Sequence, residues 1–400
     1  MSLSLKDKKQ KPFVSKAQRK QIDLEKKQSR SKLTVGRIIG RIALSTVTVL
    51  LCFVIAVFTC CFVLLNSDCE PLRDKLVLSA MQASATKWLP GLFLPDSTVE
   101  EIVASSYVVN TDVLSLDEYN AMMAESESAS DDIWKDAIDG MIFETVQGET
   151  FTGYVLLVKD PSRMFVGTSS DFKQGLVGMN IFDMAKKENA VAVINAGEFA
   201  DPGGSGTGNN PMGVTFSKGS CVWNDSLKRT FIGFDKDNKL IVTEPMTKAK
   251  AEELGIRDGV SFQNGNVLIT NEEGNISIHY ADNNTGTAQR TSIGQAADGT
   301  VILLVTDGRS ASSLGATRND VIDVMIQYGA ITAGMLDGGS SSLMYYDSYI
   351  EKYGYDETKL DQYQKRGLVN RYKAFTNPRR MPTYFCVASL EDNSESEETN

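Results

Sequence analysis

The sequence predicts an α+β fold with mixed β-sheets and a parallel strand-helix-strand unit, preceded by one transmembrane helix. Two apolar runs, 301–305 and 331–336, flank a stretch with helical signals at 317–328. An uncharged segment at 42–65 is long enough to cross a bilayer, which needs about 20 helical residues. Hairpin-like pairs of short apolar runs surround the central unit, which favours mixed sheets over a purely parallel one.

The central unit has a start and a stop signal for its helix. Thr317 and Asp320 match a capping box, and Gly329 supplies a left-handed stop. The run 301–305 lacks polar alternation, which is typical of a strand that is covered on both faces. Because strand-helix-strand crossovers are usually parallel, both strands are expected to point the same way.

A carboxylate follows each of these two predicted strands. Asp307 and Asp337 stand at the strand exits, where α/β sheets bind their ligands, so we expect the two side chains to lie close together. The glycines Gly338 and Gly339 would leave backbone N–H groups open to an anion, and Arg309 adds a planar cation. Two ordinary Asp-Gly turns are the alternative, but their matching positions favour a site.

A third predicted strand, 191–194, also ends in polar residues. It is followed by Asn195, Gly197 and Glu198, and then by a glycine-rich loop at 201–213. Glycines in such a loop let the backbone approach a ligand, whereas a surface turn is the alternative. The loop is not a Walker motif, because no Lys-Ser or Lys-Thr follows its glycines.

These segments together resemble the phosphodiester glycosidase family. Four motifs carry the resemblance in the family's order: INAGEF at 194–199, RTSIGQ at 290–295, TDGR at 306–309 and LDGGSS at 336–341. The resemblance covers roughly residues 142–387 and implies a hydrolase that acts on sugar-1-phosphodiesters. Glu198 departs from the residue that the family usually has at its position. The resemblance also favours a site role for Arg290 over a surface salt bridge.

Carboxylates and arginines suit cleavage of a sugar-1-phosphate linkage. Breaking the C1–O bond passes through an oxocarbenium-like state, which a carboxylate stabilises or attacks. The phosphate leaves readily and needs charge neutralisation more than protonation. We predict Asp337 or Glu198 as base or nucleophile and Asp307 as a partner or orienting group, with the division of roles open. The predicted substrate contacts are Asn195, Gly197, Arg290, Thr291, Arg309, Gly338, Gly339 and Ser340.

Two further functions are compatible with these residues. No cofactor is predicted to be required, but a metal-dependent phosphodiesterase would use Asp307, Asp337 and Glu198 to hold calcium or magnesium and would cut the P–O bond. A non-catalytic protein of glycan binding or exopolysaccharide assembly is the other alternative. His279 is the only histidine, so a His-rich zinc centre is excluded and a structural or surface role is expected for it.

The charge distribution predicts how the chain meets a membrane. Up to position 41 there are 13 Lys and Arg against three acids, a net of +10, so the remainder carries 28 basic and 48 acidic residues, a net of −20. The positive-inside rule then places the amino terminus in the cytoplasm and the catalytic domain outside, as a single-pass protein of the cell membrane. The expected partners are the lipid bilayer and a glycan or sugar-phosphodiester substrate, with no nucleic acid.

The predicted domain organisation follows from these segments. It comprises a basic cytoplasmic tail (1–41), the transmembrane helix (42–65), a juxtamembrane helix and linker (66–140), the phosphodiester glycosidase-like domain (141–389) and an acidic disordered tail (390–400). The stretch 71–95 has apolar residues at helical spacing and is expected to pack on the domain or along the membrane. Cys221 and Cys386 could pair, although two distant cysteines are weak evidence.

A tyrosine-rich connection at 345–376 follows the LDGGSS motif. It holds seven tyrosines and several basic residues in an otherwise acidic domain. Long connections of this kind are often lids or binding loops, and aromatic faces suit sugar rings. The alternative is a surface excursion with its own small helix.

Overall fold

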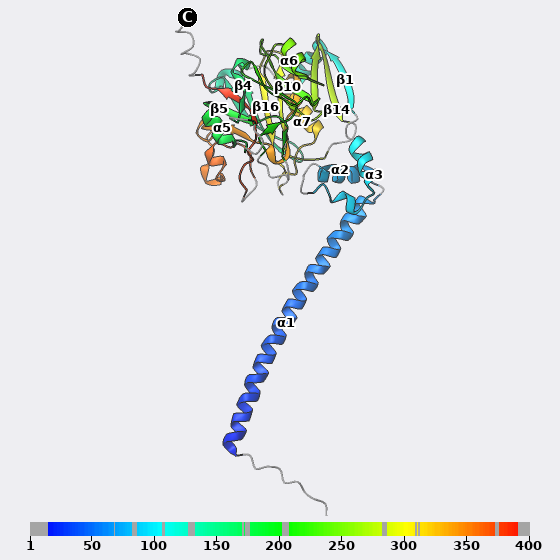
Figure 1. Cartoon of the computed structure of the whole chain (residues 1–400), viewed down its shortest axis with the longest axis vertical. Helices are drawn as coiled ribbons and strands as arrows, with labels where there is room; N and C mark the ends of the chain where they lie inside the picture. Colours follow the sequence, from blue (N-terminus) through cyan, green and yellow to red (C-terminus); the bar gives the residue numbers. More distant parts are fainter. Residues whose placement is uncertain are drawn as a thin grey trace, which may run out of the picture. The chain divides into compact units, whose positions relative to one another are not determined.

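The chain divides into two compact units, Met1–Asn66 and Ser67–Asn400. The computed structural model describes residues 15–67, 69–81, 86–105, 109–126, 133–169, 172, 177–201, 208–281, 286–308, 310, 313–372 and 376–390. In the first unit the described residues form one long helix, α1 (Lys16–Leu65), which a capping box between Ser15 and Gln18 begins (Figure 1). The part Gly36–Leu65 is long and apolar enough to cross a membrane.

The second unit contains helices and antiparallel sheets. Its described α-helices are α2 (Glu70–Met81), α3 (Asp96–Ser105), α4 (Leu116–Ser126), α5 (Ile181–Lys187), α6 (Lys248–Glu253), α7 (Arg318–Gln327) and α8 (Tyr349–Lys352). Its short 3₁₀ helices are η1 (Pro90–Leu92), η2 (Ile133–Asp136), η3 (Pro161–Arg163), η5 (Gly339–Ser341), η6 (Glu357–Lys359) and η7 (Gln364–Arg366).

The largest sheet has eight strands among the described residues. Its order is β1 (Val109–Ser115), β14 (Asn275–Ala281), β13 (Val267–Glu272), β17 (Ala330–Met335), β15 (Thr291–Ala296), β16 (Val301–Thr306), β3 (Thr152–Val158) and β2 (Met141–Gln147). The five-stranded sheet has the order β11 (Leu240–Thr243), β10 (Thr230–Asp235), β12 (Ile256–Phe262), β8 (Val214–Ser217) and β9 (Ser220–Asn224). The four-stranded sheet is β18 (Met344–Tyr346), β5 (Ala190–Asn195), β19 (Thr383–Ala388) and β4 (Met164–Thr168), and β6 (Phe199–Ala200) pairs with β7 (Asn210–Pro211).

The predicted parallel strand-helix-strand unit is wrong, because its two strands do not pair with each other. Strands β16 and β17 run the same way, but β15 lies between them and is antiparallel to both. The pairings among the described strands are all antiparallel, so the mixed sheets that we predicted are not found there either. A short turn closes β15 and β16 into a hairpin, and neighbours in sequence pair more readily than the ends of a long crossover.

The run that forms β16 is covered on both faces, as predicted. Val301, Leu303 and Val305 belong to a core between the eight-stranded sheet and the two smaller sheets. Ile302 and Leu304 belong to a second core on the opposite face, under α7 and α4. All five side chains are fully buried, which explains why the strand shows no polar alternation.

The helix of the central unit forms where its signals predict it. Thr317 caps α7, its hydroxyl accepts from the Asp320 backbone N–H, and the Asp320 carboxylate accepts from the Thr317 N–H. Gly329 follows with a φ of +75°, a left-handed conformation that favours glycine. The helix packs against β14 and β17, and it thereby shields one face of the sheet (Figure 1).

The tyrosine-rich connection is part of the folded body and not a loose lid. Tyr346 and Tyr349 are 0% and 1% exposed and belong to the first core, and Tyr363 is buried in a cluster with α5. The segment carries α8, η6 and η7, so the alternative of an excursion with its own small helix describes it better. Its tyrosines pack because their rings bury a large apolar area.

The structure also answers two smaller questions, the role of His279 and the pairing of Cys221 with Cys386. His279 lies on β14 with Nδ1 3.1 Å from the Thr111 hydroxyl and Nε2 3.3 Å from the Thr270 hydroxyl, so it has a structural role, as expected. Burial, followed by the nearby Arg318 charge, lowers the pKa of His279. The thiols of Cys221 and Cys386 are both free in the described structure, so they do not pair.

Candidate active site

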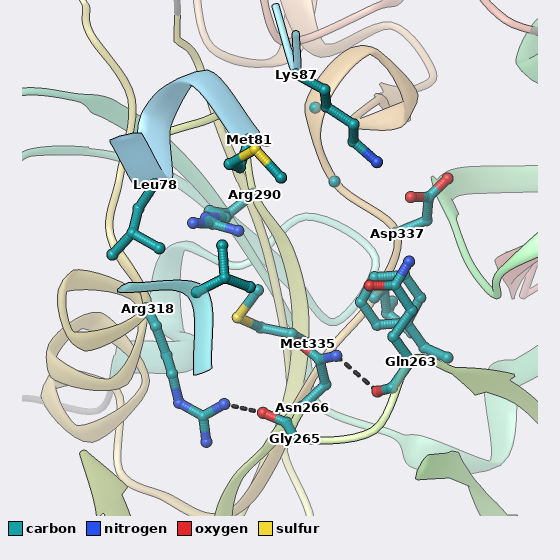
Figure 2. A pocket seen from close by; sticks show the side chains of 15 residues that line it. Leu78, Met81, Lys87, Gln263, Gly265, Asn266, Arg290, Arg318, Met335 and Asp337 are labelled. Atoms are coloured by element: carbon teal, nitrogen blue, oxygen red, sulfur yellow. Dashed lines mark hydrogen bonds between the residues drawn. The ribbon is translucent and has the colours of Figure 1, made fainter. Parts of the chain in front are cut away.

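A pocket of about 310 Å³ lies at the exit of β17 (Figure 2). Two of the four sequence motifs reach it, through Arg290 and through Asp337 with Gly338 and Gly339. Its size falls at the lower end of the range for small-molecule sites, about 300–1,000 Å³. Figure 2 shows Asp337 on one side of the pocket and Arg290 on the other, beside residues of α2.

Asp337 is held at the strand exit by its backbone and by its side chain. Its N–H donates to the Ala196 carbonyl at 3.0 Å, and its own carbonyl accepts from Asn195 Nδ2 at 2.6 Å. Burial raises the pKa of its half-buried carboxyl to about 6, against the lowering effect of Ser341 and Arg379 and with a raising effect of Glu198. A carboxyl with this pKa changes charge close to neutral pH, as catalytic acids and bases do.

Arg379 supplies a cation beside Asp337 that the sequence analysis missed. Its Nη1 donates to Ser341 Oγ at 3.0 Å and its Nη2 to Asp201 Oδ2 at 3.1 Å. The guanidinium therefore joins the LDGGSS turn to the first residue of the glycine-rich loop. The Asn-Pro-Arg-Arg stretch just before β19 was the available signal, but nothing local connects it with Asp337.

Glu198 brings a second carboxylate to this neighbourhood. Its Oε2 lies 2.9 Å from Arg229 Nε, although the N–H does not point along a hydrogen bond, and Gln263 Nε2 donates to Oε1 at 3.5 Å. The side chain is 14% exposed, and its charge acts on Asp337. The structure thus brings together Asp337 and Glu198, two of the three predicted catalytic residues. Beside them lie Arg229 and Arg379, which sequence reasoning did not select.

Asn195 and Thr291 lie behind the pocket wall. The Asn195 side chain is 0% exposed, and its Oδ1 accepts from the Thr291 hydroxyl at 2.8 Å and from the Leu343 N–H at 3.0 Å. Its amide nitrogen is occupied by the Asp337 carbonyl. Both side chains are fully buried and their polar atoms bond to the protein itself, so they brace the exits of β5 and β17. This placement does not support the direct substrate contact that was predicted for them.

The glycines of the motifs are used for close packing. A Cβ on Gly197 would lie 2.8 Å from the Ser261 carbonyl, and one on Gly338 would lie 3.0 Å from the Gln289 carbonyl. Gly339 has a φ of +62°, and its N–H donates to Gln289 at 2.8 Å. The expected anion site of open N–H groups is therefore not present at Gly339, because the protein itself uses that donor.

The remaining predicted substrate contacts are Ser340, Arg290 and Arg309. The Ser340 carbonyl accepts from the Tyr372 hydroxyl at 3.1 Å, which fixes the turn after Gly339. Arg290 lines the pocket while its Nε donates to Ala316 at 3.1 Å and its Nη2 to Gly286 at 2.7 Å, so its orientation is fixed. Arg309 lies outside the described residues.

Asp307 does not join the pocket of Asp337. Its carboxylate accepts from the Tyr154 hydroxyl at 2.9 Å and from the Arg371 backbone N–H at 3.0 Å. The expectation that both aspartates share one site is wrong because β15 lies between β16 and β17 and the two carboxyls have different partners. Asp307 follows the row of Val301, Leu303 and Val305, which faces the first core. Asp337 leaves the end of β17 towards Ala196 and interacts with Ser341, Arg379 and Glu198.

Replacing Asp307 should change how stability depends on pH. Burial raises the pKa of its carboxyl to about 6, so the folded state holds this proton more tightly than the unfolded state. The stabilisation is therefore complete below about pH 4 and is lost as the pH rises through about 6, with at most about 3 kcal/mol involved. Asp307→Asn should flatten this part of the melting-temperature profile between pH 4 and 7, whereas the exposed Asp347→Asn should leave it unchanged. Parallel profiles for wild type and Asp307→Asn would contradict a raised pKa of Asp307 in the folded state.

Residues that precede the catalytic motifs complete the pocket. Leu78 and Met81 of α2, together with Lys87 and Val103, form part of its wall (Figure 2). The Thr287 N–H donates to Ser79 Oγ at 3.2 Å, and a Cβ on Gly286 would lie 2.2 Å from the Ser79 nitrogen. The expectation that 71–95 packs on the domain is confirmed for α2, and the contact depends on a glycine.

A buried arginine fixes the opposite wall. Arg318, at the start of α7, donates through its guanidinium to the carbonyls of Gly265 and Val267. Burial lowers its pKa to about 10, which leaves it charged at neutral pH. The sequence marks this residue only as part of a helix, because its partners come from the distant β13 hairpin.

Comparisons with known proteins place these features in a family. The model of the phosphodiester glycosidase family matches residues 188–388. The SPbeta prophage-derived uncharacterized protein YomE of Bacillus subtilis (strain 168) is 25% identical over 201 residues, 46% of this chain and 27% of that protein. The chain therefore spans about a quarter of the length of this relative.

Two solved structures are similar at low sequence identity. One is the catalytic domain of zebrafish N-acetylglucosamine-1-phosphodiester alpha-N-acetylglucosaminidase, auto-inhibited by its pro-peptide. It is 16% identical with a TM-score of 0.46, over 72% of this chain and 90% of that one. The other is a hypothetical protein from Synechocystis, 13% identical with a TM-score of 0.42, over 62% of each chain.

Proposed function

Because the chain belongs to the phosphodiester glycosidase family, we propose that it hydrolyses the C1–O bond of sugar-1-phosphodiesters in the Asp337 pocket. The observation that carries this proposal is the half-buried Asp337 carboxyl, with a pKa raised to about 6, beside Glu198 and Arg379. Two carboxylates in different surroundings are the groups that glycoside hydrolysis requires.

The proposed division of roles follows from the charges. Ionised Asp337 stabilises or attacks C1 as the C1–O bond breaks, and the leaving phosphate monoester takes the bonding electrons. Arg379, which already spans Ser341 and Asp201, neutralises that phosphate. Glu198, held by Arg229 and Gln263, accepts a proton from the water that adds to C1.

The metal-dependent alternative has less support from the geometry. Within the described ranges, no group of three or more His, Cys, Asp or Glu could hold a metal ion. The trio expected to bind calcium or magnesium is divided, since Asp307 contacts Tyr154 and Arg371, away from Asp337 and Glu198. The reaction itself distinguishes the two functions, because a phosphodiesterase attacks phosphorus and a glycosidase attacks carbon.

Hydrolysis in ¹⁸O water tests the proposed reaction. We expect the detergent-solubilised full chain to cleave at least one member of a panel of methyl sugar-1-phosphodiesters, with ¹⁸O appearing on C1 of the sugar. Turnover should survive addition of EDTA. Label in the phosphate product, or loss of turnover with EDTA that calcium or magnesium restores, would establish the phosphodiesterase instead. Binding without turnover across the panel would favour the non-catalytic alternative.

The proposed location of the enzyme is outside the cytoplasm, anchored by α1. Support comes from the apolar part Gly36–Leu65, with a net charge of +10 up to position 41 and −20 after it. The substrates would then be envelope or secreted glycans, including exopolysaccharides. In sealed vesicles of cell-surface orientation, external protease should digest the part after Ser67 and spare a tag at the amino terminus. Protection of the carboxyl-terminal part would contradict this orientation.

A further inference from the structure

A second hollow of about 250 Å³ lies over β2 and β3, and we call it the tyrosine hollow. The residues that define it are Phe143, Tyr154, Tyr349, Tyr355, Gln364 and Arg371. Its lining residues all differ from those of the Asp337 pocket. Part of the wall comes from the tyrosine-rich connection, which is therefore fixed in place and does not have to close over a ligand.

The wall of the hollow is a packed set of aromatic rings. Phe143 stacks with Tyr154 at 6.5 Å between centroids, and Tyr349 meets Tyr355 edge to face at 5.4 Å. Tyr355 also lies 6.4 Å from Phe143, yet its side chain is 38% exposed. The rigid framework thus presents one accessible aromatic ring, the kind of surface on which the apolar C–H face of a ligand stacks.

A buried hydroxyl in this wall has unused hydrogen-bonding capacity. Tyr349 is 1% exposed, and its hydroxyl finds no hydrogen-bond partner among the described residues. Buried polar groups are normally paired, so an unpaired one that lines a hollow indicates where a ligand group or water binds. The oxygen can both donate and accept, as a sugar hydroxyl can.

Further polar groups are held in fixed positions around the rings. The backbone N–H of Arg371 and the Tyr154 hydroxyl both donate to the buried Asp307 carboxylate, which fixes these two lining residues. Gln364 is buried beside them, and its amide is held by the protein, since Oε1 accepts from the Asp361 N–H at 3.2 Å and Nε2 donates to the Val369 carbonyl at 3.4 Å. Charges of both signs lie near the hollow, since Lys359 and Arg371 line it and the Asp361 charge acts on Tyr349. This balance favours a neutral, hydroxyl-rich ligand over a strongly charged one.

We propose that the tyrosine hollow is a saccharide-binding site that holds one neutral pyranose unit of a glycan chain. The ring of the sugar stacks on Tyr355, and one of its hydroxyls bonds to the Tyr349 hydroxyl. The site does not depend on the proposed hydrolysis, because a glycan without a phosphodiester bond has the same features.

Saturation-transfer NMR with unphosphorylated oligosaccharides tests this site. Cellotetraose, maltotetraose and chitotetraose are titrated up to about 10 mM into the detergent-solubilised full chain, with hydrogen exchange measured in parallel. We expect at least one of them to bind and to slow exchange at 349–355. Tyr355→Ala should weaken that binding by about tenfold, and Tyr355→Phe, which keeps the ring, should retain it.

The control and the opposing outcomes separate this site from the catalytic one. These sugars lack the bond that the enzyme would cleave, so a failed phosphodiester assay leaves this experiment intact. Melting temperatures of both variants establish that the fold is kept. No binding by any of the three sugars, or equal binding by wild type and Tyr355→Ala, would overturn the proposal. Exchange protection confined to the Asp337 pocket would overturn it as well.

Discussion

Asp337→Asn should lower kcat on a sugar-1-phosphodiester by at least about a hundredfold while the protein stays folded. The carboxylate is the charged group nearest to the proposed reaction, and acid–base or electrostatic groups of this kind typically contribute factors of 10² or more. Asparagine has the same shape and can still accept from Gly338 and Ser341, so the turn should survive. Initial rates and melting temperature are measured together.

A control variant tests the loss of a hydrogen-bonded carboxyl elsewhere in the domain. Asp323 also has a pKa raised by burial, and it accepts from the Tyr280 hydroxyl at 2.8 Å, but it does not line the Asp337 pocket. Asp323→Asn should therefore keep nearly normal turnover. Full activity of Asp337→Asn, with an unchanged melting temperature, would remove Asp337 from the chemistry.

The pH profile gives an independent readout for the same residue. If the ionised form of Asp337 acts on C1, kcat/KM should fall as the pH drops through about 6, because the raised pKa protonates it there. Activity that falls as the pH rises through about 6 would instead assign it the role of a general acid. The residual activity of Asp337→Asn should show neither of these changes near pH 6.

Arg379→Met should produce the second large loss, also of about a hundredfold in kcat/KM on the phosphodiester. The substitution removes the guanidinium that bonds to Ser341 and Asp201 and that faces the expected phosphate. It also removes a charge that lowers the pKa of Asp337, so the limb near pH 6 should move to higher pH. Arg379→Lys keeps the charge without the planar fork and should recover part of the activity.

Two comparisons separate this role from a structural one. Arg380 is the exposed neighbour of Arg379 in the same turn, and Arg380→Met should leave turnover nearly unchanged. A nitrophenyl glycoside of the same sugar carries no phosphate, so Arg379→Met should impair its hydrolysis much less. Equal losses on both substrates, without a shifted pH limb, would indicate that Arg379 only supports the fold.

Local signals predicted much of the catalytic domain. The capping box at Thr317 and Asp320 and the stop at Gly329 correctly bounded α7, because caps involve residues three or four apart. The strand exits at Asn195 and Asp337 were also located correctly, since the apolar runs before them end abruptly. The parallel pairing was wrong because β15 lies between the two strands, and neither strand carries a local sign of that neighbour.

Which residues face the site was harder to predict than where its motifs lie in the sequence. Four motifs indicated the right loops, yet Asn195 and Thr291 proved to brace the strands, and Arg379 came from a turn without any motif. Hydrogen-bond partners that are far apart in sequence decide whether a polar residue faces a ligand or the interior. Lys87 and the α2 residues reach the pocket from a segment outside the family match.

The sequence by itself determined the apolar span, the α+β class, the strand exits and the resemblance that identified the family. These features depend on length, composition and short-range periodicity, which a single chain displays directly. Only the tertiary structure decided that Asp307 and Asp337 have separate sets of partners and that the tyrosine-rich connection packs into the core. Side-chain direction at a strand exit depends on which face each strand turns to its neighbours, and long-range packing alone sets that.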